Sequence, residues 1–147
     1  MKYSCHWYLR NDGTLGRFPI VELTADGTIA SVHECGPTLT EQPSTRFAAG
    51  VMVPGLIAWG RCDRTLQAMG YVHAIDLPGS NPAPQWTDRD SFCRTMHSLT
   101  AGRARLSGTY PRLGAIVPGA QPGLVLLQGI DLNTFAPCRY TAKPLLP

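Results

Sequence analysis

The chain has 147 residues, 44% hydrophobic and 16% charged, a composition that predicts one folded domain and excludes an intrinsically disordered chain. The formal net charge is +3, but the basic residues are scattered, so we expect no nucleic-acid partner. The densest basic group, Arg103, Arg105 and Arg112, is interpreted as solvated surface. Fifteen glycines and thirteen prolines favour short strands and frequent turns over long helices.

Targeting signals and cysteine usage bear on where the protein is found. Residues 1–7 contain neither an apolar run nor a small-residue cleavage site, so we expect no signal peptide. No apolar run approaches the roughly 20 residues that span a bilayer, so we expect no membrane partner. The five cysteines are widely spaced without a C-x-x-C pair, which predicts reduced thiols and a cytoplasmic location.

The first third of the chain predicts a meander of four short strands. Tyr3–Leu9 alternates in the manner of a half-buried strand, and the Ala25-Asp26-Gly27 turn is typical of a hairpin. A polar loop over 36–44 precedes the last strand of the group. The predicted strands are Tyr3–Leu9, Phe18–Leu23, Thr28–Cys35 and Phe47–Val53.

The rest of the chain predicts one principal helix between irregular segments and strands. Phe92, Met96 and Leu99 fall at i, i+4 and i+7, which predicts an amphipathic helix over about 88–106. Thr87 and Asp90 have the spacing of a capping box. Further predicted elements are a short helix over Asp63–Met69, an irregular connection over 77–86, and strands over Leu113–Val117, Leu124–Leu127 and Arg139–Ala142.

The order of these elements determines the predicted fold class. Strands, one helix and further strands predict a mainly β, α+β fold, and the missing βαβα alternation excludes a TIM barrel. We expect a single domain over 1–147. Its predicted parts are N-terminal strands over 1–57, a short connection over 58–87, a helix over 88–108 and C-terminal strands over 112–147.

Two separated parts of the sequence resemble one protein family. The first part contains A-D-G-T-I-A-S-V at 25–32 and V-M-V-P-G-L-I at 51–57. The second contains M-H-S-L-T-A-G-R-A-R-L-S-G at 96–108 and R-L-G-A-I-V-P-G-A-Q-P-G-L-V-L-L-Q-G-I-D-L at 112–132. They resemble the two flanking regions of the amidohydrolase superfamily, metal-dependent hydrolases that include imidazolonepropionases, dihydroorotases and deaminases.

The resemblance implies an accessory domain without its catalytic partner. In that superfamily the two chain ends form a small β-sandwich, and a TIM barrel lies between them in sequence. Such a barrel takes about 250 residues, whereas only Ala58 to Ser91 separates the two matching parts here. The resemblance therefore implies a small β-sandwich assembled from N- and C-terminal strands, with no barrel.

The residues around the first matching part depart from the family pattern. With Pro54-Gly55 aligned, Ala58 stands where the family usually has aspartate, and Gly60 and Cys62 stand where its two metal-binding histidines lie. A zinc hydrolase needs three or more protein ligands and an open position. We therefore expect no catalytic residue and no cofactor.

The remaining histidines and cysteines leave a small number of candidate ligands. His33 and Cys35 would face the same side of a strand, and Cys62 is the third candidate for a zinc site. The competing interpretation is buried thiols beside a surface imidazole. His73, with Asp76 three residues later, resembles a base with an orienting carboxylate, although a plain polar position near a short strand is the favoured interpretation.

Three aromatic residues lie in the stretch that replaces the barrel. Trp59, Tyr71 and Trp86 are candidates for a core patch, an interface or a pocket wall. Without a barrel, one apolar sandwich face needs a new cover. We expect the helix over 88–106, with Trp59 and Trp86, to supply it, and a homodimer or a protein partner is the other interpretation.

Two hypotheses about function follow. The first is a non-catalytic, amidohydrolase-related domain that acts through protein association or ligand binding. The second is a residual metal-dependent hydrolase of non-peptide C–N bonds, or a hydrolase subunit, whose site a partner or second copy completes. Its candidate residues are His33, Cys35, His73 and Cys62.

Overall fold

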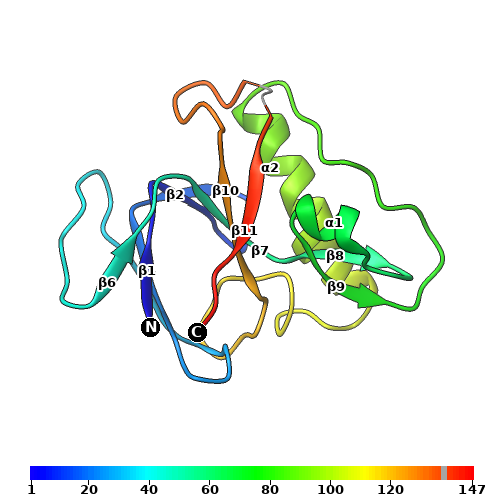
Figure 1. Ribbon diagram of the computed structural model, residues 1–147, viewed down its shortest axis with the longest axis horizontal. Helices are drawn as coiled ribbons and strands as arrows, with labels where there is room; N and C mark the ends of the chain where they lie inside the picture. Colours follow the sequence, from blue (N-terminus) through cyan, green and yellow to red (C-terminus); the bar gives the residue numbers. More distant parts are fainter. Residues whose placement is uncertain (137–138) are drawn as a thin grey trace.

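The structure is a computed structural model that describes residues 1–136 and 139–147 (Figure 1). Its strands within these residues are β1 (Lys2–Ser4), β2 (Trp7–Leu9), β3 (Leu15–Arg17), β4 (Pro19–Leu23), β5 (Ile29–Glu34), β6 (Thr45–Phe47), β7 (Val51–Pro54), β8 (Leu56–Trp59), β9 (Tyr71–Ile75), β10 (Leu124–Gln128) and β11 (Thr141–Pro144). The helical segments are α1 (Arg64–Ala68), α2 (Arg89–His97), the π-helical segment η1 (Ser98–Gly102) and α3 (Arg103–Leu106). Among the described residues, no helix combines the length and the apolar character needed to cross a bilayer.

Two sheets form a sandwich to which both ends of the chain contribute. The four-stranded sheet has the order β5-β4-β1-β6, and the five-stranded sheet has the order β11-β10-β7-β2-β3. In the second sheet the C-terminal β10 pairs antiparallel with β7, with Leu126 opposite Met52. The predicted mainly β sandwich with one principal helix is therefore confirmed.

The central strands β7 and β10 are buried on both of their faces. Their side chains alternate between two apolar cores, and none of those named below is more than 2% exposed. The side chains that face the four-stranded sheet are Met52, Leu124 and Leu126. Those that face the opposite side are Val51, Val53, Val125 and Leu127.

Helix α2 covers the second of these faces. Figure 1 shows α2, β8 and β9 on one side of the β7–β10 pair, and β1 and β6 on the other. Phe92 and Met96 are fully buried in the same core as Val51, and the ring of Trp86 lies 4.9 Å from that of Phe92. The expected cover by the helix and Trp86 is therefore present within the chain itself.

The principal helix runs without a break from Arg89 to Leu106, as predicted, but its cap differs by one residue. Asp88 is the N-cap: its carboxylate accepts from the Ser91 amide at 2.8 Å, and the Ser91 hydroxyl accepts from the Asp88 amide at 3.0 Å. The expected Thr87–Asp90 box is wrong because the Thr87 amide also donates to the Ser91 hydroxyl, which places Thr87 before the cap.

Segment η1 gives the helix a π-helical turn in its middle. The Thr100 hydroxyl donates to the Met96 carbonyl at 2.7 Å. The chain after the helix packs directly on this turn at Gly114, whose φ is +77°, and a Cβ there would lie 2.7 Å from the Thr100 carbonyl oxygen. A glycine at position 114 is therefore required by both backbone conformation and contact distance.

Several parts of the chain differ from the sequence-based expectations. The strand expected over Phe47–Val53 is divided between β6 and β7, which lie in different sheets. Tyr3–Leu9 is not one strand, because the amides of His6 and Trp7 both donate to the Gly50 carbonyl, which divides the segment between the two sheets. Residues 113–117 form bends and irregular backbone rather than a strand. The stretch over 58–87, expected as a short connection with one short helix, also contains β9, whereas the helix expected over Asp63–Met69 is confirmed as α1.

Strands β8 and β9 form a separate parallel pair joined through α1. Sequence reasoning did not find β9, because Val72 and Ala74 are exposed and five residues are too few for a clear period. The pair packs beside the sandwich instead of extending either sheet. A seam therefore forms between β9 and the β10–β11 edge.

Removing the Phe92 ring should test how strongly the second core depends on α2. Because this side chain is fully buried, we expect Phe92→Ala to lower the free energy of unfolding by about 3–5 kcal/mol, measured by urea denaturation. Leu106→Ala, at a helix residue that is 77% exposed, should change it by less than about 0.5 kcal/mol. Equal effects of the two substitutions would contradict the assigned packing.

Candidate functional site

The structure does not bring the three candidate metal ligands together. His33 is exposed on β5, whereas Cys62 follows β8 and donates its thiol to the Tyr71 carbonyl at 3.5 Å. Cys35 lies just after β5. In the described part of the chain, no three His, Cys, Asp or Glu side chains are grouped to hold a metal ion. Burial, with the nearby Asp63 carboxylate, raises the pKa of the Cys62 thiol, which disfavours the thiolate that a metal requires.

His73 makes a contact that joins β9 to the sandwich. Its Nε2 lies 2.8 Å from the Pro122 carbonyl oxygen, and since a carbonyl only accepts, Nε2 carries the proton in this contact. Asp76 lies after β9 and is exposed. The arrangement links Pro122, which precedes β10, to the neighbouring β8–β9 pair.

The three aromatic candidates occupy different environments. Trp86 is buried against Phe92, and Tyr71 is buried in the same core. Trp59 is half-buried and packs at the edge of a third, smaller core, with the Arg103 guanidinium 4.7 Å from its ring centre. The three side chains therefore do not form one common patch.

Arg103 is a buried structural residue, which corrects its interpretation as solvated surface. Its side chain is 8% exposed and donates to the Ile57 carbonyl at 2.9 Å, the Asn81 side-chain oxygen at 2.8 Å and the Ser80 carbonyl at 2.7 Å. Burial lowers the pKa of this guanidinium. Neutral oxygens and the Trp59 ring therefore stabilise the cation in place of a carboxylate.

Asn81 extends this network along β8. Its side chain accepts from the Trp59 amide at 2.7 Å and donates to the Trp59 carbonyl at 2.9 Å. The next residue, Pro82, accepts a hydrogen bond from the Tyr71 hydroxyl at 2.8 Å. The Arg103–Asn81 network therefore holds the connection over 77–86 against β8 and fixes the direction of the Tyr71 ring.

An apolar pocket of about 390 Å³ lies in the seam between the β8–β9 unit and the sandwich edge. We call it the β9–β11 pocket. Gly70, with φ of +106°, lets the chain pass from α1 into β9 close to β11, since a Cβ there would lie 3.6 Å from the Ala142 Cβ. The pocket is lined by Gln67, Ala68, Gly70, Tyr71, Val72, Val125, Ala142 and Pro144.

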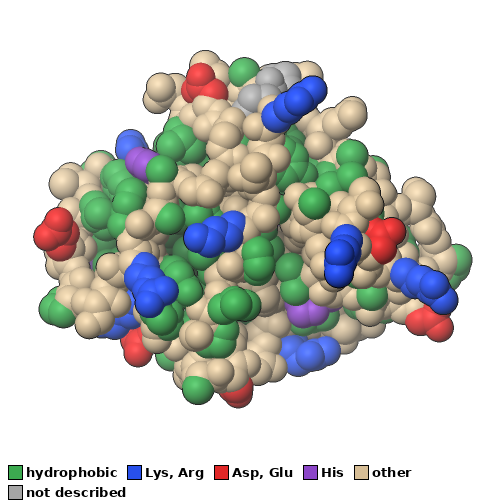
Figure 2. Space-filling view, viewed as in Figure 1, with side chains coloured by type: hydrophobic (Ala, Val, Ile, Leu, Met, Phe, Trp, Pro, Cys, Tyr) green, Lys and Arg blue, Asp and Glu red, His purple; other side chains and the backbone are tan. Residues whose placement is uncertain are grey.

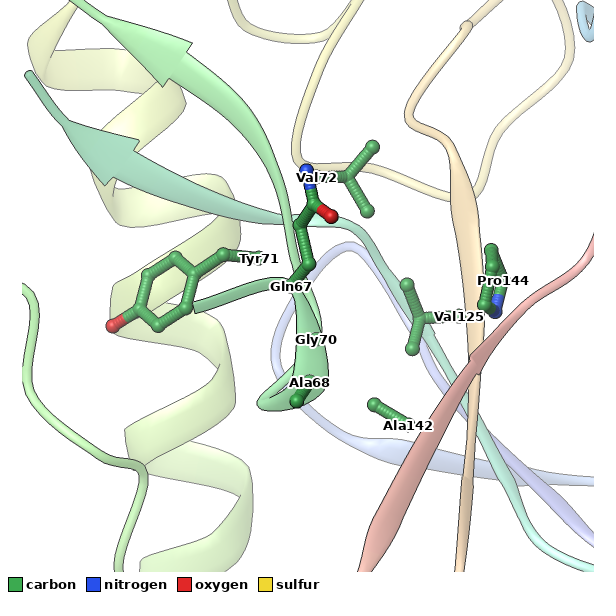
Figure 3. A pocket seen from close by; sticks show the side chains of 8 residues that line it. All are labelled: Gln67, Ala68, Gly70, Tyr71, Val72, Val125, Ala142 and Pro144. Atoms are coloured by element: carbon green, nitrogen blue, oxygen red, sulfur yellow. The ribbon is translucent and has the colours of Figure 1, made fainter. Parts of the chain in front are cut away.

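The chemistry of this lining is almost entirely apolar. Figure 3 shows Val72, Val125 and Ala142 around the space, with the Tyr71 ring directed away from them. The Tyr71 hydroxyl is engaged by Pro82, and burial raises its pKa. Of the described lining residues, only Tyr71 carries a titratable side chain, and Gln67 supplies the one free amide.

Sequence reasoning identified Tyr71 alone among the pocket residues. Gln67 and Ala68 come from a short helix, while Val125 and Ala142 come from strands more than fifty residues later. No local pattern marks such a set, because the seam exists only after β9 has packed beside β10 and β11. The charge pattern does not mark the pocket either, because Lys and Arg side chains are spread over the face seen in Figure 2.

Comparison with known proteins gives structural likeness of low similarity only. No protein-family model matches the chain, and no curated protein matches it. Among solved structures, an amidohydrolase from Brucella melitensis is similar over 40% of this chain and 12% of its own length, with a TM-score of 0.33 and 17% sequence identity. At this TM-score the likeness carries no conclusion about fold or function.

Substitution of Asn81 should test the network that holds the 77–86 connection. Asn81→Ala removes three hydrogen bonds and leaves the buried Arg103 with one acceptor fewer, so we expect the free energy of unfolding to fall by about 1–3 kcal/mol. Gln85→Ala, at an exposed position in the same connection, is the matched control and should be neutral. Urea denaturation of both variants measures the difference, and a neutral Asn81→Ala would show that the network is dispensable.

Proposed function

We propose that this protein is a non-catalytic binding domain, related to the accessory sandwich of the amidohydrolase superfamily, whose β9–β11 pocket takes a small, mainly apolar molecule. The relationship rests on the two matching parts of the sequence, above all residues 112–132. The binding function rests on the pocket and its lining. Its volume of about 390 Å³ lies in the range of sites that accept small molecules.

The lining favours binding over chemistry. General acid–base or nucleophilic catalysis needs a positioned titratable or nucleophilic group, and the Tyr71 hydroxyl already donates to the Pro82 carbonyl. Gln67 offers an amide that both donates and accepts. The matching ligand is therefore an apolar ring or chain that carries one hydrogen-bonding group.

The adjoining sheet edge favours a small molecule over an added protein strand. β11 is the outermost strand of its sheet, but it carries Lys143 and ends at Pro144. Lysine and proline on an edge strand oppose pairing with another chain. An extended peptide would meet this obstacle, whereas a compact ligand that enters beside Ala142 would not.

Benzamide, an apolar ring with one amide, is the first probe. Titration with benzamide should change the amide chemical shifts of Val72 and Val125. Binding to Ala142→Phe should be at least 10-fold weaker, because the new ring fills the pocket. Thr141→Phe places the same ring on the exposed neighbouring residue of β11 and should bind benzamide like the wild type. Unchanged binding by Ala142→Phe, or shifts at other residues, would refute this pocket as the site.

The non-catalytic part of the proposal is tested by metal content and activity together. Purified, untagged protein should contain well below one zinc, iron or manganese per chain by elemental analysis. It should not hydrolyse dihydroorotate after zinc is added, since His33, Cys35 and Cys62 do not converge. A stoichiometric metal with turnover would contradict the proposal, and loss of that turnover in His33→Ala or Cys62→Ala would identify the ligands.

A further inference from the structure

Two buried hydroxyl groups on the four-stranded sheet lack a hydrogen-bond partner. They are Ser4 Oγ on β1 and Thr45 Oγ1 on β6, and neither has a partner among the residues that the structure describes. Ser4 is 2% exposed. A buried hydroxyl without a partner is destabilising, and such groups are rare in folded proteins. Two of them on adjacent strands therefore require an explanation.

The strand register places both hydroxyls on the outer face of this sheet. Tyr3 pairs with Val21, and Val21 belongs to the core between the two sheets. Because side chains alternate along a strand, Ser4 faces away from that core. Thr45 pairs with Lys2, two residues before Ser4, and so lies on the same outer face.

A loop crosses this face and forms a pocket above the two hydroxyls. It connects β5 to β6, the two edges of the four-stranded sheet, so it must pass over the sheet. The space between loop and sheet has a volume of about 380 Å³. We call it the hydroxyl pocket, and it is lined by Ser4, Leu39, Thr40, Glu41, Gln42, Thr45 and Phe47.

The lining combines dense hydrogen-bonding capacity with one aromatic ring. Ser4 and Thr45 can each donate and accept, the Glu41 carboxylate accepts, and the Gln42 amide does both. The Phe47 side chain is 46% exposed, and the ring of His6 meets it edge-on at 5.2 Å. The pocket therefore offers alternating donors and acceptors beside an apolar platform.

These features select the class of ligand. An anion is disfavoured, because the described lining contains Glu41 and no Lys, Arg or His. A purely apolar ligand would leave both hydroxyls unpaired. A ring that carries several hydroxyl groups supplies donors and acceptors at its edge and C–H groups on its face, and so matches both the polar floor and Phe47.

We propose that the hydroxyl pocket binds a neutral sugar, either free or as one residue of a glycan. The pocket lies on the sheet remote from β9 and β11 in strand order, so this binding is independent of the β9–β11 pocket and of the function proposed for it. Glu41 and Gln42 are assigned to the sugar hydroxyls, and Phe47 to one face of the ring. Ser4 Oγ and Thr45 Oγ1 are covered in this structure, and each joins the sugar hydroxyls when its side chain rotates toward the pocket.

Saturation-transfer NMR with the full chain tests the proposal. Glucose, galactose, mannose and N-acetylglucosamine are each titrated to about 20 mM, and cellobiose is included to represent a glycan. We expect at least one sugar to receive saturation and to shift the amides of Ser4, Gln42 and Phe47. Tighter binding of cellobiose than glucose assigns the site to glycan residues, and the reverse assigns it to free sugars.

Matched variants separate a ligand site from a merely structural pair of hydroxyls. Ser4→Ala and Phe47→Ala should each weaken sugar binding at least 10-fold, while Ser31→Ala, at an exposed position of β5, should not change it. Ser4→Ala should also raise the Tm by about 2–4 °C, because it removes an unpaired buried hydroxyl. This gain shows that the variant folds.

Three results would overturn the proposal. The first is the absence of binding of any of these sugars to the wild type at 20 mM. The second is binding of butylammonium in their place, which would assign the pocket to cations through Glu41. The third is a lower Tm for Ser4→Ala, which would show that a bound water or a protein group already satisfies this hydroxyl.

Discussion

The double burial of β7 and β10 is the constraint on which the rest of the fold depends. Because Met52 and Leu126 point to one side and Val53 and Val125 to the other, this strand pair cannot form an outer layer with one face in water. An uncovered face would be an apolar patch of a size that isolated proteins rarely expose. The four-stranded sheet covers one face and α2 the other, and this requirement explains why a mainly β chain retains one long helix.

Helix α2, which covers the second face, also determines how residues 77–86 are held. Residues 77–86 must reach from β9 to the start of α2, and they carry Trp86 into the core beneath that helix. Arg103, at the far end of the same helix, binds Ser80 and Asn81, so the helix fixes the connection that leads into it. The cost of burying a guanidinium is offset by three oxygen acceptors and the Trp59 ring.

The two pockets follow from the same arrangement but differ in chemistry. The β9–β11 pocket lies where a parallel strand pair meets the edge of the sandwich without joining it, and its walls are apolar because both units present core-type residues such as Val125. The hydroxyl pocket lies beneath a polar loop on an outer face, where Ser4 Oγ and Thr45 Oγ1 have no hydrogen-bond partner among the described residues. A single small sandwich thus carries an apolar and a polar pocket, and both proposed functions rest on these pockets rather than on the fold.

Local sequence patterns determined the helix over 88–106, the hairpin at Ala25-Asp26-Gly27 and the buried strand at Leu124–Leu127, because each depends on residues within a few positions of one another. Tertiary structure alone decided what those patterns contact. Arg103 belongs to a basic cluster in sequence and becomes buried because β8 and Asn81 present oxygens to it. Val125 and Ala142 reach the same pocket as Gln67 only through strand pairing, and Ser4 and Thr45 share a face only through the β1–β6 register. The physical reason is that hydrophobic periodicity indicates which side of a helix or strand is apolar, whereas long-range packing determines what that side contacts.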